Sequence, residues 1–70
     1  MKLKRGMILE GDDNKLCIYL KKNNSKTSYV VQLDIMGNPV LLDLIETKKL
    51  KRPISVPDDF KQIDITLDEN

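Results

Sequence analysis

Apolar and polar positions alternate in residues 27–35, where every second residue from Tyr29 to Ile35 is large and apolar. This period of two is typical of a β-strand with one buried face. A second apolar run covers residues 15–20, and the polar sequence KKNNSK that separates the two runs suits a hairpin loop. We therefore expect residues 15–20 and 27–35 to form an antiparallel hairpin.

The register of this sheet follows from the requirement that apolar side chains share one face. In the first hairpin this requirement places Ile18 opposite Val31. If Gly37 and Asn38 form a two-residue turn, the same face continues into a third strand, with Val31 opposite Leu44. The predicted buried face consists of Leu16, Ile18, Leu20, Tyr29, Val31, Leu33, Ile35, Val40, Leu42 and Leu44.

Residues 39–50 also fit a helix, which would give an α+β fold instead. The apolar residues between Val40 and Ile45 include a helical stripe, Pro39 suits a first turn, and two lysines suit a last turn. The matching register of three strands favours the hairpin.

The remaining apolar segments suggest how the sheet is completed. Residues 6–11 and 62–68 are further strand candidates, and residues 51–60 have two prolines and suit an extended connector. We expect an all-β fold, either a small five-stranded curled antiparallel sheet or an SH3-like barrel, because closure removes exposed edges. Residues 1–70 would form one domain, in which 58–70 are an acidic C-terminal strand or tail.

Composition supports strands and argues against catalysis. The chain has no Ala, no Trp and no His, so it lacks the best helix former and any imidazole base. Its single cysteine, Cys17, cannot form an internal disulfide or a zinc cluster, and is expected to be a small, partly buried apolar residue. We expect no catalytic residue, cofactor, metal or small-molecule substrate. No apolar stretch is long enough for a signal peptide or membrane span, which indicates a cytoplasmic protein without membrane contact.

Charge alternates in blocks although the net charge is only +1. The predicted hairpins bring two basic segments to one end of the sheet, with Asp12, Asp13 and Asp34 near the other end. Such a basic pole would suit phosphate binding, with Tyr19 pointing outward to stack on a base. The basic pole consists of Lys21, Lys22, Lys26, Lys48, Lys49, Lys51 and Arg52.

The opposite face of the predicted sheet is not cleanly polar, and on the predicted register Val30 faces Ile45. If the terminal strands cover only the inner face, this apolar patch is exposed and would suit a protein partner or a second copy of the chain. The alternative is that the curled sheet or the C-terminal tail covers it. This predicted patch consists of Cys17, Tyr19, Val30, Leu41 and Ile45.

Taken together, the sequence predicts a non-catalytic binding or regulatory protein that occupies a macromolecular surface. A protein partner is favoured over nucleic acid, because ten lysines and two arginines offer few of the bidentate contacts that base recognition uses. Small size and many lysines and asparagines suit an accessory or inhibitory protein, for example one encoded by a phage.

Overall fold

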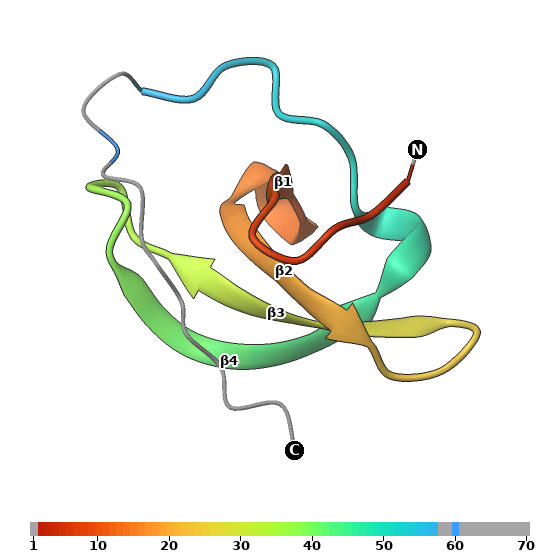
Figure 1. Cartoon of the computed structure of the whole chain (residues 1–70). Coiled ribbons are helices and arrows are strands. Elements are labelled where there is room, and N and C mark those ends of the chain that lie inside the picture. Colours follow the sequence, from red (N-terminus) through yellow and green to blue (C-terminus); the bar gives the residue numbers. More distant parts are fainter. Residues whose placement is uncertain (1, 58–59, 61–70) are drawn as a thin grey trace.

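The computed structural model describes residues 2–57 and residue 60, and these form a four-stranded antiparallel sheet (Figure 1). The strands follow one another in the order β1-β2-β3-β4, and the sheet curls without closing. No α-helix occurs among the described residues. The elements are β1 (Ile8–Glu10), the 3-10 turn η1 (Asp12–Asn14), β2 (Leu16–Lys22), β3 (Thr27–Leu33), β4 (Pro39–Glu46) and the 3-10 turn η2 (Thr47–Lys49).

The predicted all-β class is confirmed, and the alternative of a helix at 39–50 is wrong because β4 occupies most of that segment. The strand predicted within 6–11 is present as β1. The number of strands is four within the described residues, not five. The fifth predicted strand, 62–68, lies outside the residues that the structure describes.

The first hairpin pairs Ile18 with Val31, as predicted. The register then shifts by one residue at Leu20, because Tyr19 pairs with Val30 while Lys21 pairs with Tyr29. The shift is a β-bulge, which lets the strand bend and supports the curl of the sheet.

The second hairpin has a different turn from the predicted one. Gly37 and Asn38 do not form a two-residue turn; the loop closes through hydrogen bonds from Gly37 N to the Asp34 carbonyl at 3.0 Å and from Asp34 N to the Asn38 carbonyl at 2.9 Å. The Asp34 carboxylate also accepts from Met36 N and Asn38 N, at 2.8 and 2.9 Å. Gly37 has a φ of +83°, the left-handed conformation that a three-residue hairpin loop requires.

This turn moves the register of the second hairpin by two residues. Val31 faces Leu42 instead of Leu44, and Val30 faces Asp43 instead of Ile45. A shift of two keeps each side chain on its predicted face, since strand side chains alternate with a period of two. The grouping into two faces is therefore correct between the two irregularities of the sheet, although the individual pairs are not. It fails at the bulge after Tyr19, where Lys21 shares a face with Tyr29, and the register shifts again beyond Gln32, where Leu33 pairs with Pro39.

The identity of the buried face is the main correction. The core is made by the face that had been predicted to be exposed, where Cys17, Tyr19, Val30 and Ile45 are buried. On the other face Ile18, Leu20 and Leu33 are also buried, but Leu42 and Leu44 of β4 are exposed. Both faces are apolar, so alternation alone cannot tell which one is covered. The core cluster is Leu9, Cys17, Tyr19, Val30, Ile45 and Leu50, with Leu3 and Met7 packed against it.

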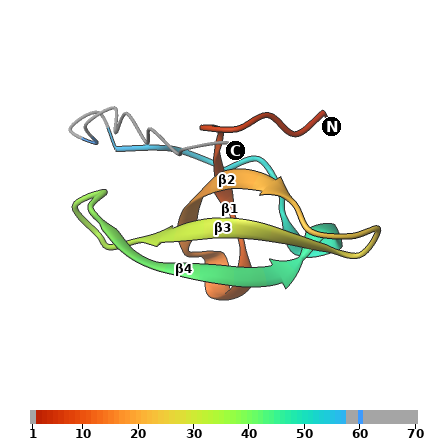
Figure 2. The same ribbon diagram turned by 60° about the horizontal axis from the view of Figure 1, so that its bottom comes forward.

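The path of the chain after β4 explains which face is covered. Thr47 begins η2, and Leu50 then joins the core cluster. The next residue, Lys51, forms an antiparallel bridge with Glu10 through hydrogen bonds of 2.8 and 3.0 Å. The Glu10 carboxylate is buried and accepts from Ile54 N at 3.0 Å, which fixes the following connector. Figure 2 shows the N-terminal segment and this connector beyond β2, with β4 at the opposite margin of the sheet.

A test of this architecture is available at two glycines with left-handed backbones. Gly37 lies against Phe60, and a Cβ built at Gly37 would come 2.9 Å from the Phe60 ring, whereas a Cβ at Gly6, which has a φ of +90°, meets nothing within 4 Å. Gly6→Ala should therefore cost only the backbone term of about 1–2 kcal/mol, measured by urea unfolding. Gly37→Ala should cost clearly more, because the Phe60 ring must also move. Equal losses for the two variants would show that Phe60 does not rest on the turn.

Candidate functional site

The apolar patch predicted from the sequence is not available for binding. Cys17, Tyr19, Val30 and Ile45 are buried in the core, and only Leu41 of that patch is exposed. The patch prediction is wrong for the four buried residues, because the chain after β4 covers their face. Tyr19 is likewise not free to stack on a base.

A different set of apolar side chains is exposed along β4 and the turn before it. Leu42 is 62% exposed and Leu44 is 46% exposed, although both had been predicted to be buried. Ile35 in the turn is 91% exposed. These residues follow one another along a single strand and its turn, with Leu42 and Leu44 on one face of the sheet and Leu41 on the other. They therefore line both faces of the same edge. We call this surface the β4 strip, which consists of Ile35, Met36, Val40, Leu41, Leu42 and Leu44.

The β4 strip lies at an open edge, because β3 is the only described strand that pairs with β4. Thr47 N donates to the Lys26 carbonyl at 2.8 Å, which shows that odd-numbered residues here direct their backbone groups towards β3. Leu42 and Leu44 therefore direct theirs outward. The Leu44 N–H is already bonded, because the Asp43 carboxylate accepts from it at 2.8 Å. The edge thus offers exposed side chains to a partner, but one of its outward backbone N–H groups is already hydrogen-bonded to Asp43.

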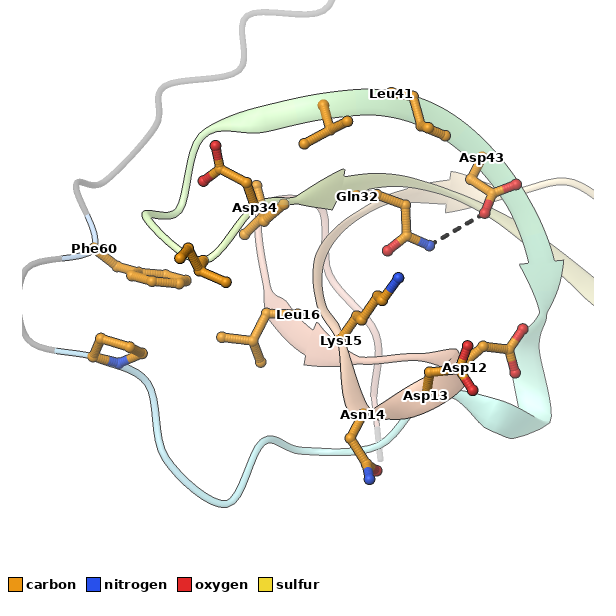
Figure 3. Close-up of a pocket in the computed structure, with 14 residues that line it drawn as sticks. Asp12, Asp13, Asn14, Lys15, Leu16, Gln32, Asp34, Leu41, Asp43 and Phe60 are labelled. Carbon is orange, nitrogen blue, oxygen red and sulfur yellow. Dashed lines mark hydrogen bonds between the residues drawn. The ribbon is translucent and has the colours of Figure 1, made fainter.

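A groove of about 830 Å³ adjoins the β4 strip, where the core face continues past Val30 towards the second turn (Figure 3). One end is apolar, and there Leu16 lies near Phe60. At the other end lie Asp12, Asp13 and Asp43. The groove shares Ile35, Val40 and Leu41 with the β4 strip.

The described polar side chains of the groove carry a net negative charge, since they include four aspartates and a single lysine, Lys15. Gln32 Nε2 donates to the Asp43 carboxylate at 3.2 Å. The hydrogen bond from the backbone N–H of Asn38 lowers the pKa of the exposed Asp34 carboxyl. Hydrogen bonds from the backbone of Met36 and Gly37 and from the Asn38 side chain lower this pKa further, by smaller amounts. Asp34 is therefore ionised at neutral pH.

The structure brings together the two segments of the predicted basic pole. Lys26 accepts the backbone hydrogen bond from Thr47, so the loop and η2 are neighbours. All seven cations are exposed, but Lys48 lies 3.4 Å from Glu46, and Lys49 lies 3.3 Å from Asp12 and 3.8 Å from Glu46. Asp12 had been predicted to lie at the other end of the sheet, and its contact with Lys49 corrects this.

The remaining members of the basic pole have separate surroundings. Lys21 Nζ lies 5.6 Å from the centre of the Tyr29 ring, a cation–π contact on the face opposite the core. The backbone of Lys51 is held by Glu10 while its side chain, like that of Arg52, is exposed. The pole is thus a group of neighbouring cations whose charge is partly balanced by Glu46 and Asp12.

Cys17 has the surroundings of a core residue. Burial raises the pKa of its thiol from the ordinary 9.0 to about 11, and the negative charge of Asp43 adds to the increase. A thiol with such a pKa is protonated at neutral pH and is a poor nucleophile. Within residues 2–57 and at residue 60, no group of three or more His, Cys, Asp or Glu side chains could hold a metal ion. None of the described helices is long and apolar enough to cross a membrane.

The groove and the β4 strip were both missed by the sequence analysis. A signal for the groove was present in the clustered acids of EGDDN and in the block 27–47, which has three acids and no base. The signal for the strip was the apolar sequence VLLDLI, which is apolar on both faces and suited to a strand that is not fully covered.

Comparison with known proteins adds no identification, since no family model, no curated protein and no solved structure matches this chain.

The raised pKa of Cys17 predicts a loss of stability at high pH. The unfolded thiol ionises near pH 9 and the folded one near pH 11, so the contribution of the protonated thiol is complete below pH 9 and is lost as the pH approaches 11. The difference in free energy of unfolding between the wild type and Cys17→Ala should shrink by about 2–3 kcal/mol between pH 8 and pH 11. Urea unfolding across this range measures the difference. Parallel pH profiles for the two proteins would contradict the assignment.

Proposed function

We propose that this chain is a non-catalytic binding protein that acts by occupying the surface of a protein partner through the β4 strip. The observation that carries the proposal is the open edge strand itself, on which Leu42 and Leu44 are exposed. Contiguous apolar side chains on the surface of a small protein are typical of interaction sites, and an uncovered apolar edge strand is unusual without a partner.

The chemistry of the β4 strip favours a protein over a nucleic acid. Between Ile35 and Leu44 the only charged side chain is Asp43, which would repel phosphate. The strip also indicates how a partner would be recognised. Because the outward N–H of Leu44 is bonded to Asp43, side-chain packing would contribute more than the addition of a strand to the edge. An accessory or inhibitory role fits such a surface, since masking a partner requires no chemistry.

The β4 strip can be tested with a displayed library of random peptides selected against the wild-type protein. We expect selected peptides to bind with amide NMR shifts along β4, and Leu42→Thr combined with Leu44→Thr to weaken their binding at least tenfold. Threonine keeps the preference for strands while removing apolar contact area. Binding is measured by titration, and sedimentation of the free protein shows whether a second copy occupies the strip.

The matched control is Ile54→Thr, because Ile54 is 95% exposed but lies in the connector and not on β4. This variant should bind the selected peptides as the wild type does, and circular dichroism should show that all variants remain folded. The proposal is wrong if selection yields no binder and the protein is monomeric. It is also wrong if the double variant binds as well as the wild type.

The second candidate function is nucleic-acid binding by the basic pole. One observation favours it, namely the hydrogen bond of Thr47 to Lys26, which joins the two basic segments. The contacts of Lys48 and Lys49 with acidic side chains count against it, because those charges are already partly balanced. The protein-binding proposal is therefore preferred.

This alternative predicts that short single- and double-stranded oligonucleotides shift amide signals of residues 21–28 and 47–52, and that binding weakens steeply with salt. Lys22→Glu combined with Lys26→Glu should abolish the shifts. Lys15→Glu is the control with a charge change of the same sign outside the pole, because Lys15 lies in the groove. An NMR titration at 20 and 150 mM salt decides the matter: spectra that do not change at either salt concentration exclude nucleic acid.

A further inference from the structure

The groove beside the β4 strip has two chemically different ends, and this arrangement restricts what can bind there. Leu16 and Phe60 lie at the apolar end, so a side chain placed there would leave water. The volume of about 830 Å³ falls in the range of ligand sites. The apolar end alone does not distinguish among apolar ligands.

The other end supplies the selectivity. The Asp43 carboxylate accepts hydrogen bonds from Gln32 and Leu44, which fix its position, and each of its oxygens has capacity for a further donor. Asp13 has no ion pair among the described residues and is exposed. Among the described residues, Lys15 is the only cation that lines the groove. The groove thus attracts cations and disfavours anions, in contrast to the basic pole.

The geometry points to one occupant, a basic segment of the protein partner. We propose that an apolar side chain of this segment packs against Leu16 and Phe60, while a neighbouring lysine or arginine pairs with Asp13 and Asp43. Charge complementarity carries the assignment of a basic segment, because the part of the lining that the structure describes has four carboxylates against one ammonium group. The inference rests on the proposed function, since the groove shares Ile35, Val40 and Leu41 with the β4 strip.

The test uses three capped tetrapeptides and the full-length protein in an amide NMR titration. The first probe is acetyl-Lys-Leu-Val-Arg-amide, the second replaces both basic residues by Glu, and the third replaces Leu and Val by Ser. We expect the first probe to shift signals of residues 12–16 and 32–35, and both others to bind at least fivefold more weakly. Increasing the salt from 20 to 150 mM should weaken the first probe severalfold, because exposed charge pairs are screened.

Variants of acidic residues inside and outside the groove test where the basic side chain of the peptide binds. Asp13→Asn combined with Asp43→Asn removes two charges, and asparagine still offers an oxygen to Leu44 N and tolerates the φ of +58° at residue 13. This variant should bind the first probe at least fivefold more weakly. Glu46→Gln removes a charge from β4 outside the groove and should bind it as the wild type does.

Equal binding of the Glu-containing probe, or unchanged binding to the double Asn variant, would overturn the inference. Spermine binding as tightly as the first probe would also overturn it, because the groove would then bind cations without any contribution from apolar contacts. If the tetrapeptides fail while library peptides still depend on Leu42 and Leu44, only the groove inference is wrong. If neither kind of peptide binds, the proposed function fails as well.

Discussion

Two backbone hydrogen bonds between Glu10 and Lys51 hold the segment after η2 against β1, and the rest of the structure depends on this contact. The contact positions Leu50 in the core cluster, and the Glu10 carboxylate then holds Ile54. In a sheet of four strands with apolar residues on both faces, either face could become the buried core. By crossing one face, the chain after β4 makes that face the core and leaves the other to be covered less completely.

The same contact explains why β4 is exposed. The returning chain pairs with β1, at the opposite edge of the sheet from β4. The curl therefore remains open beside β4, and the apolar residues of this strand stay at the surface. The groove is a consequence of the same opening, because it lies where β4 and the segment after β1 approach each other without pairing. Both candidate binding surfaces thus arise from an incomplete closure of the sheet.

The sequence predicted the local features of the fold well. The positions of β2 and β3 and the pairing of Ile18 with Val31 follow from the period of two, as does the division of residues into two faces between the bulges. The second turn was missed because Gly37 fits two kinds of hairpin loop, and only the hydrogen bonds of Asp34 decide between them. The choice of the buried face depends on Glu10 and Lys51, which are 41 positions apart in the sequence and have no apolar pattern to mark their pairing. Every error in the candidate patch follows from that choice.

The carboxylate of Asp43 has a consequence for solubility. It interrupts the sequence Val-Leu-Leu-Asp-Leu-Ile, which would otherwise be a continuous apolar segment on an uncovered edge, the type of segment that stacks into fibrils. The charge opposes close approach of identical strands, and its bond to Leu44 N removes a donor that a neighbouring chain would need. A single side chain thus opposes the self-association of an exposed apolar edge. The aggregation tendency of this protein is accordingly expected to depend more on residue 43 than on its overall stability.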